Sequence, residues 1–187
     1  MRLRLPIRTE RLELRYFREE DIEAVHSYRS DPQVTRLMFF GPDTSEDTRE
    51  YLSSMVETQL AEPRWVWELA VVRAHDSRVI GGCDLTLEER HEADLGYILS
   101  REAWGRGYGT EIARALVERG FSDLGVDRIF ATCDRENEAS RGVLIKAGLQ
   151  FESVIERHKY AKDRWWDSEL YGLTIDQWKA QRGAAGA

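Results

Sequence analysis

Residues Asp94–Phe121 have the sequence DLGYILSREAWGRGYGTEIARALVERGF, and this stretch decides the fold. It begins as a β-strand, because Leu95, Tyr97 and Leu99 alternate with other residues over a short apolar run. It ends as a helix, because apolar residues recur at helical spacing through its second half. The turn between them holds three glycines in five residues, Gly105, Gly107 and Gly109. Such a turn presents free backbone N–H groups at the positive end of the helix dipole, so it suits a phosphate or pyrophosphate.

Three phosphate-binding patterns compete for this turn. The dinucleotide fingerprint G-x-G-x-x-G would need glycine where Thr110 stands, and a Walker loop would need a lysine that the turn lacks. The pyrophosphate loop of GNAT-superfamily acetyltransferases, Gln/Arg-x-x-Gly-x-Gly/Ala, also lies between a strand and a long helix. Residues 104–109 resemble it, except that Trp104 replaces Gln or Arg. The longer run Trp-Gly-x-Gly-Tyr-Gly-Thr-Glu resembles the RimJ/RimL branch, which acetylates the N-termini of ribosomal proteins. The alternative is a tight turn that binds no ligand.

A second stretch, residues 137–149, has the sequence NEASRGVLIKAGL. It resembles the second acetyl-CoA motif of the same superfamily, Asn-x-x-Ser-x-x-Val-Leu-x-Lys-Ala-Gly-Phe/Leu. Helix capping explains part of the pattern, since Asn137 can begin a helix and Gly148 can end one. Capping does not require Ser140, so the whole pattern favours cofactor binding. Residues 9–15 (TERLELR) and the pattern Trp-Asp-x-x-x-Tyr at residues 166–171 extend the RimJ/RimL resemblance over roughly residues 9–173.

This resemblance implies an α/β (α+β) GNAT fold, with a mixed, mostly antiparallel sheet of about seven strands flanked by helices. The β-rich runs that predict strands are residues 12–16, 65–72, 79–87, 94–99, 128–133, 150–159 and 164–173. The strands that begin at Asp94 and Arg128 should form the one parallel pair, joined by the crossover helix after the glycine turn. In GNAT proteins these two strands splay apart, and the thioester arm of acetyl-CoA lies in the gap.

Length and composition predict one domain over residues 1–187, with a core at about residues 9–173. Residues 174–181 should form a short last helix, and residues 183–187 a disordered tail. No apolar run approaches the ~20 residues of a membrane span, and the N-terminus lacks a signal-peptide core. The net charge of −7 opposes binding to nucleic acid. We therefore expect a cytoplasmic protein that contacts neither a membrane nor nucleic acid.

The two cysteines, Cys83 and Cys133, fall in predicted strands and should be buried free thiols in a reducing compartment. No Cys/His cluster has the spacing of metal ligands, so we expect no metal. A covalent acyl-enzyme on Cys133 is the alternative to a buried thiol, but direct acetyl transfer needs no nucleophile on the enzyme.

The resemblance also implies which residues form the site. Backbone groups after Asp94 would pair with the pantetheine arm of acetyl-CoA, and amides of the glycine turn would hold its pyrophosphate. Asn137 would contact the arm from the other side. The cofactor-binding candidates are Tyr97, Ile98, Leu99, Trp104, Gly105, Arg106, Gly107, Tyr108, Gly109, Thr110, Asn137 and Ser140.

Attack of an amine on a thioester sets three chemical requirements. The ammonium must lose a proton, the tetrahedral oxyanion needs a hydrogen-bond donor, and the CoA thiolate gains from a nearby hydroxyl. A backbone N–H near Tyr97 or Ile98 is a candidate for the oxyanion, and Ser140, by its motif position, for the thiolate. The base stays open among four carboxylates that could equally be surface groups, Asp84, Asp94, Glu152 and Glu156.

The expected partners are acetyl-CoA and an amine acceptor, for a monomer or homodimer. The first choice of acceptor is a protein or peptide N-terminal α-amine. A small molecule (a polyamine, an amino acid or an aminoglycoside) is the alternative within the same enzyme class. A non-catalytic acyl-CoA-binding module is the alternative from another class, which the departure at Trp104 favours. Four aromatic residues are candidates for acceptor contacts or for the core, Phe39, Phe40, Trp65 and Trp67.

Overall fold

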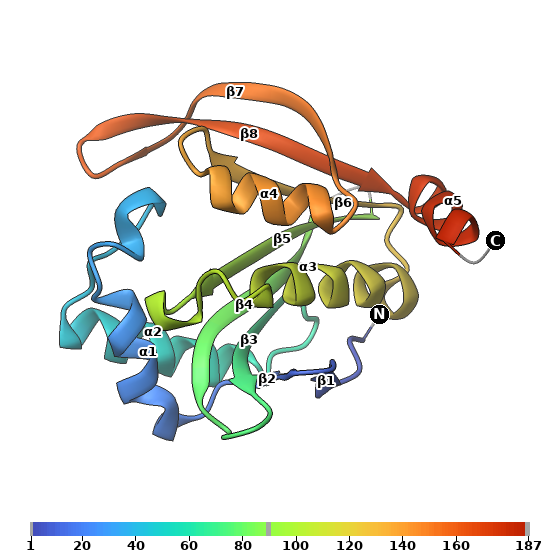
Figure 1. The fold of residues 1–187 in the computed structure, drawn as a ribbon. Coiled ribbons are helices and arrows are strands. Elements are labelled where there is room, and N and C mark those ends of the chain that lie inside the picture. The colour runs from blue at the N-terminus through green and yellow to red at the C-terminus, as the bar shows by residue number, and fades with distance from the viewer. Residues whose placement is uncertain (1, 89–90, 186–187) are drawn as a thin grey trace.

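The computed structural model describes residues 2–88 and 91–185. Its centre is an eight-stranded sheet in the order β1-β2-β3-β4-β5-β6-β8-β7 (Figure 1). The strands are β1 (Ile7–Arg8), β2 (Leu12–Tyr16), β3 (Val66–Arg73), β4 (Val79–Glu88), β5 (Glu92–Leu99), β6 (Arg128–Asp134), β7 (Gln150–Ala161) and β8 (Arg164–Thr174). The helices are α1 (Ile22–Arg29), α2 (Ser45–Thr58), α3 (Tyr108–Arg119), α4 (Glu138–Lys146) and α5 (Ile175–Ala185).

The seven predicted strands are all present, and the eighth is β1 at the edge of the sheet. Its two residues pair with β2, Ile7 with Leu14 and Arg8 with Glu13. Two residues are too few to show the apolar alternation by which a strand is detected in a sequence. The expected count of about seven strands is therefore one short.

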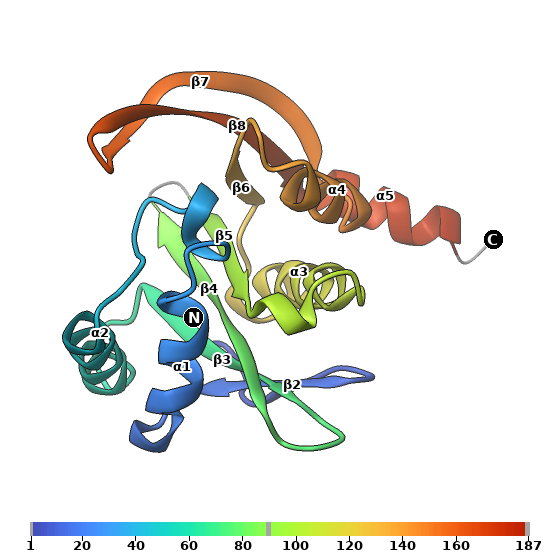
Figure 2. The same ribbon diagram turned by 60° about the vertical axis from the view of Figure 1, so that its left-hand side comes forward.

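Helices cover both faces of the sheet, with α1 and α2 on one face and α3 and α4 on the other (Figure 2). The larger core lies on the α3 side, where Leu69, Leu85 and Leu95 of three adjacent strands are buried. The smaller core lies on the α1 side and includes Ala70 and Val72. Successive residues of a strand face opposite sides, so each strand of this region contributes to two environments.

Strands β5 and β6 pair in parallel over three residue pairs, Glu92–Arg128, Ala93–Ile129 and Asp94–Phe130. Beyond them, β5 stays paired with β4 as far as Leu99, and β6 stays paired with β8 as far as Asp134. Within the described residues, β5 and β6 share no pairing after Asp94 and Phe130. The second halves of the two strands therefore diverge, and the predicted parallel pair is confirmed.

The hairpin of β7 and β8 extends from the second part of the sheet towards the α1 side of the molecule (Figure 1). At its tip, Lys162 Nζ donates a hydrogen bond to the carbonyl oxygen of Thr35 at 2.7 Å. Behind the tip, Trp166 of β8 packs edge-on against Phe39, with ring centroids 5.9 Å apart. The hairpin is thus fastened to residues 35–39 and faces the sheet across that loop.

The C-terminal helix α5 is longer than predicted. The expected disordered tail is wrong for residues 183–185, which belong to α5, while residues 186–187 lie outside the described residues. Two contacts hold the helix against the domain. The ring of Trp178 lies 5.1 Å from that of Phe121, and Gln181 Nε2 donates to the carbonyl oxygen of Gly148 at 3.1 Å. Residues 183–187 are all glycine or alanine, and nothing in that sequence indicates that the helix before them is held by long-range contacts.

Candidate active site

The glycine loop, residues 104–109, includes the first two residues of α3, Tyr108 and Gly109. Gly105 and Gly107 have φ angles of +70° and +80°, and Gly107 is the N-cap of the helix. This left-handed backbone is costly for a residue with a Cβ atom, which explains both glycines. The first N–H groups of α3 have no partner within the helix. They and the positive end of the helix dipole fit the pyrophosphate of acetyl-CoA.

Trp104, where the GNAT pattern has Gln or Arg, ties the loop to the end of β5. Its indole N–H donates a hydrogen bond to the carbonyl oxygen of Leu99 at 2.9 Å, while 47% of the residue stays exposed. The departure from the pattern therefore has a structural role. It also engages the Leu99 carbonyl, which was one of the groups expected to bind the pantetheine arm.

The register of β4 and β5 decides which backbone groups of β5 face the gap. Ser100 N–H donates to the carbonyl oxygen of Ile80 at 2.8 Å, and the same register pairs Ile98 with Gly82. In an antiparallel pair, the polar groups of alternate residues point to the same neighbour. Those of Ile98 therefore point to β4, and those of Tyr97 point to the opposite edge, towards the gap. This geometry favours Tyr97 over Ile98 as the oxyanion donor.

The structure brings the side chains of Tyr97 and Ser140 together on the α3 side of the sheet. Tyr97 Oη lies 2.9 Å from Ser140 Oγ, and burial raises the pKa of Tyr97 to about 12. Ser140 is held from its other side, because its N–H donates to Asn137 Oδ1 at 3.0 Å and makes Asn137 the N-cap of α4. A Cβ atom at Gly109 would lie 3.1 Å from a methyl group of Val143 and 3.5 Å from the Tyr97 ring. The two sequence motifs thus meet around Tyr97.

Cys133 lies close to this pair, on β6. Burial raises the pKa of its thiol to about 11, with a further contribution from the charge of Glu169. A nucleophilic cysteine needs the thiolate, which a raised pKa disfavours at neutral pH. The environment of Cys133 therefore favours a buried thiol over an acyl-enzyme. Both Cys83 and Cys133 are free and buried.

Three carboxylates lie on the other face of the sheet, one on each of β3, β4 and β5. Glu68 is directly across from Asp84, and Asp84 is across from Gly96, two residues from Asp94. Burial raises the pKa of Asp84 to about 7, and the charges of Glu68 and Asp94 add to the rise. Burial also raises the pKa of Asp94 to about 6 and that of Glu68 above its ordinary value. Carboxylates with such values are suited to accept a proton near neutral pH.

The remaining groups around these acids come from distant parts of the chain. Tyr51 of α2 donates to Glu68 Oε2 at 2.7 Å. The positive charge of Lys159 on β7 lowers the pKa of both Asp84 and Asp94, although burial outweighs this effect in each. Lys159 Nζ also lies 4.7 Å from the centroid of the Phe39 ring. We call Glu68, Asp84 and Asp94, with Lys159 and Phe39, the acid cluster.

The structure separates the four candidate bases. Asp84 and Asp94 belong to the acid cluster, whereas Glu152 binds Arg128 Nη2 at 2.6 Å and Glu156 is exposed. Glu68 and Lys159 were missed in the sequence. Glu68 is a lone acid within the apolar run of β3, which is a usable signal, but Lys159 has no local feature that distinguishes it from other charged residues of an edge strand.

The four aromatic residues that were candidates for acceptor contacts lie in different environments. Trp67 is a core residue with 1% exposure, while Trp65 is exposed. Phe40 packs under the guanidinium of Arg29, with 4.2 Å from Cζ to the ring centroid. Of the four, only Phe39 is joined to the acid cluster by a contact with Lys159.

Within residues 2–88 and 91–185, no group of three His, Cys, Asp or Glu side chains is arranged to hold a metal ion. None of the helices described there combines the length and apolar composition of a membrane span.

Comparison with known proteins agrees with this geometry. The acetyltransferase (GNAT) domain family matches residues 11–150. A GNAT-family acetyltransferase from Bacillus anthracis has a TM-score of 0.81 and 29% identity, over 91% of this chain and 98% of that chain. The fold is shared with RimL, a ribosomal alpha-N-protein acetyltransferase solved with coenzyme A (TM-score 0.77, 19% identity, 92% and 98% coverage). It is also shared with spermidine N-acetyltransferase from Vibrio cholerae, solved with CoA and spermine (TM-score 0.76, 16% identity, 91% and 99% coverage). The family match spans most of the chain, and the chain therefore belongs to the GNAT acetyltransferases, acyltransferases that use acetyl-CoA.

Proposed function

We propose that this acetyltransferase moves the acetyl group of acetyl-CoA directly to the α-amine at the N-terminus of a peptide or protein. The observation that carries the proposal is the pairing of two sites across the gap between β5 and β6. The glycine loop and the Tyr97–Ser140 pair lie on the α3 side, and Asp84 lies on the α1 side. A thioester in the gap would be accessible from both.

In this proposal Asp84 takes a proton from the ammonium of the acceptor. The free amine attacks the thioester carbon, and the N–H of Tyr97 donates to the oxyanion that forms. The nitrogen gives its second proton to solvent as the carbon–sulfur bond breaks. The thiolate takes a proton from the hydroxyl of Ser140, which is reprotonated by the hydroxyl of Tyr97, and Tyr97 regains its proton from solvent. All the residues that act in these reaction steps belong to one chain, so a monomer suffices for acetyl transfer.

The pKa of the base supports an α-amine over a lysine side chain. An α-ammonium has a pKa of about 8, against about 10.4 for lysine. A base with a pKa of about 7, as burial gives Asp84, differs from the first by about one unit and from the second by more than three. Proton transfer to Asp84 is therefore far less unfavourable from an N-terminus. RimL, which shares the fold, supports the same acceptor class by analogy.

A polyamine is the second candidate, because the acid cluster contains three carboxylates. Glu68, Asp84 and Asp94 lie on adjacent strands, and like charges at such positions repel unless a cation lies between them. A second ammonium on the acceptor would supply one. The spermidine enzyme that shares the fold makes this the main competitor.

Release of free CoA thiol from acetyl-CoA tests the proposal on four acceptors in parallel. These are short peptides with free N-termini, N-blocked lysine peptides, spermidine and an aminoglycoside. We expect turnover with the free N-termini. Turnover confined to spermidine would replace this acceptor by the polyamine, and CoA binding without turnover on any amine would indicate a non-catalytic module. The proposed compartment is the cytoplasm, since the free thiols of Cys83 and Cys133 suit a reducing environment.

A further inference from the structure

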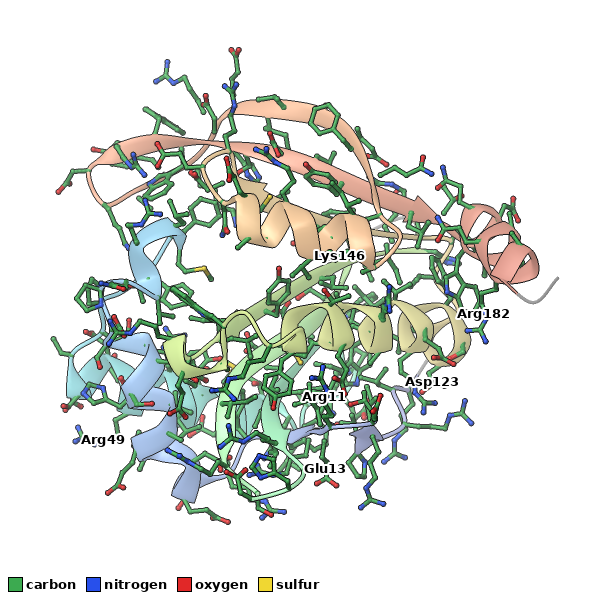
Figure 3. The ribbon with its side chains drawn as sticks, viewed as in Figure 1. Arg11, Glu13, Arg49, Asp123, Lys146 and Arg182 are labelled. Carbon is green, nitrogen blue, oxygen red and sulfur yellow. The ribbon has the colours of Figure 1, made fainter. Side chains whose placement is uncertain are left out.

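The N-terminal segment, residues 3–11, lies along α3, and we call it the strap. Leu3 and Ile7 anchor it in the larger core. At one end, Arg4 Nε binds Asp123 Oδ1 at 2.9 Å, just beyond the last turn of α3. At the other end, Arg11 reaches the first turn of α3 beside the glycine loop (Figure 3). The strap thus connects the edge of the sheet to both ends of the crossover helix.

The guanidinium of Arg11 contacts Arg106 of the glycine loop and Tyr108 at the start of α3, and it lies beside Gly107 between them. Its Nη1 donates a hydrogen bond to the carbonyl oxygen of Arg106 at 2.9 Å. Its Cζ lies 4.7 Å from the centroid of the Tyr108 ring, and a Cβ atom at Gly107 would lie 3.5 Å from Nη2. A trans peptide is planar, so its C=O and N–H point in opposite directions. By holding the carbonyl of Arg106, Arg11 therefore turns the N–H of Gly107 away from the strap.

Glu111, in the first turn of α3, fixes Arg11 in turn. Its Oε2 accepts from Arg11 Nε at 2.7 Å, and its Oε1 accepts from the backbone N–H of Arg11 at 2.9 Å. The hydroxyl of Thr9 donates to the same Oε1 at 2.5 Å. Burial alone would raise the pKa of Glu111, but the hydrogen bonds from Thr9 and Arg11 lower it below the ordinary value. The carboxylate is therefore charged and held by the strap.

The negative charge of Glu111 argues against a direct role of this residue in binding phosphate. A carboxylate beside the N–H groups that open α3 repels any phosphate bound there, because the two anions compete for the same positive field. As a direct contributor to phosphate binding, Glu111 would be unfavourable. Its geometry instead suits an anchor, which orients the forked guanidinium of Arg11 on two sides. A cleft of about 420 Å³ separates the strap from α3 and reaches Gly107 and Thr110, so direct contact between Arg11 and a ligand phosphate is the rival explanation.

We propose that Arg11 is a positioning residue that holds the glycine loop in its pyrophosphate-binding conformation, and that Glu111 holds Arg11. The inference rests on the proposed role of the loop as the pyrophosphate site. It gives a physical role to the Thr-Glu-Arg segment at residues 9–11, which lies about a hundred residues from the loop in the sequence and is absent from the proposed chemistry.

The first test measures binding of CoA, dephospho-CoA and pantetheine to folded Arg11→Met by calorimetry. Dephospho-CoA keeps the pyrophosphate and lacks the 3′-phosphate, and pantetheine lacks both. We expect the variant to bind CoA and dephospho-CoA about tenfold more weakly, equivalent to about 1.4 kcal/mol, and to bind pantetheine as the wild type does. The matched control is Arg8→Met, which removes another strap arginine whose Nε binds Glu13 Oε2 at 2.9 Å without touching the loop. It should leave all three affinities unchanged.

The second test uses Glu111→Gln, which removes a negative charge near the loop with little change in shape. If Glu111 acts only by repelling the bound phosphate, this variant should bind CoA more tightly than the wild type. If Glu111 instead holds Arg11 in place, the variant should bind CoA more weakly and pantetheine with unchanged affinity. The double variant with Arg11→Met should then be no weaker than Arg11→Met alone, because the two residues act as one unit. Arg11→Lys keeps the positive charge but loses the forked guanidinium, so its affinity for CoA should lie between those of Arg11→Met and the wild type.

Several results would overturn the inference. Tighter CoA binding by Glu111→Gln would do so, as would a loss in Arg11→Met that is confined to CoA, because that pattern indicates direct contact with the 3′-phosphate. An equal loss for pantetheine would indicate a general structural defect. If Arg11→Met does not fold, Arg11→Lys and Glu111→Gln carry the test. A wild-type protein that binds dephospho-CoA no better than pantetheine would instead refute the pyrophosphate role of the loop itself.

Discussion

The carboxylate of Asp84 occupies the space that a side chain at Gly96 would need. A Cβ atom built on Gly96 would overlap Asp84 Oδ1, which crosses from β4 over the backbone of β5. Glycine at this position therefore has a steric cause that is independent of φ. It allows an acid of β4 to reach the edge at which β5 begins to separate from β6.

Gly96→Ala should displace Asp84 and reduce acetyl transfer with little effect on CoA. We expect kcat to fall at least tenfold and stability to fall by roughly 1–3 kcal/mol, because the added methyl overpacks a tight site. Steady-state kinetics and calorimetry with CoA check this. Gly183→Ala in α5 is the control, since its Cβ would have no neighbour within 4 Å. Full activity in Gly96→Ala would contradict the placement of Asp84.

Asp84→Asn should abolish the acidic limb of the pH–rate profile. A base acts only when deprotonated, so kcat/KM of the wild type should rise with pH through about 7, the value to which burial raises the pKa of Asp84. The variant should lose about a hundredfold or more in rate and follow the ionisation of the acceptor alone. Glu152→Gln, which removes an acid bound to Arg128, should keep the wild-type profile. A retained limb in Asp84→Asn would move the role to Asp94.

Asp84→Asn, which should lower activity, should raise the stability of the protein above neutral pH. Since the folded-state pKa of Asp84 lies above its unfolded value of about 3.9, the folded protein binds the proton more tightly. Stability is therefore lost as pH rises from about 4 to about 7. Asp84→Asn should remove part of that loss and be more stable than the wild type at pH 8. Urea unfolding at pH 5 and pH 8 measures the difference; identical pH dependence in the two proteins would refute the burial of the charge.

Ser140→Ala should lower kcat about tenfold and leave the KM for acetyl-CoA unchanged, because its hydroxyl acts only as the thiolate forms. Tyr97→Phe removes the hydroxyl 2.9 Å away and should give a smaller decrease. If the two hydroxyls act as one proton relay, the double variant should be no slower than Ser140→Ala. Equal small changes in kcat and KM for Ser140→Ala would instead indicate a packing role.

Capping preferences in the sequence predicted the start of α4. Asn137 was expected to begin a helix, and its Oδ1 accepts from the N–H of Ser140 at 3.0 Å. These preferences depend on a few neighbouring residues, so the sequence alone reveals them. The parallel pair was predictable for a similar reason, since a strand, a glycine turn and a helix followed in order.

The acid cluster could not be predicted in the same way. Glu68, Asp84 and Asp94 come from three strands, and Lys159 comes from a hairpin far along the chain. Their pKa shifts depend on burial and mutual distance, which no local pattern specifies. Trp104 is an intermediate case. The motif showed that it departs from the GNAT pattern, but only the fold showed that its indole N–H binds Leu99.

The three residue pairs that join β5 to β6 also make a seam in the protein. On one side of it, β1 to β5 form a continuous antiparallel unit, and on the other side β6, β8 and β7 form a second one. Across this seam the described residues pair at three positions, so backbone hydrogen bonds contribute little to joining the two units. The larger core joins them instead, because it includes Leu95 of the first unit and Ile129 of the second, and the integrity of the whole sheet therefore depends on side-chain packing at this line.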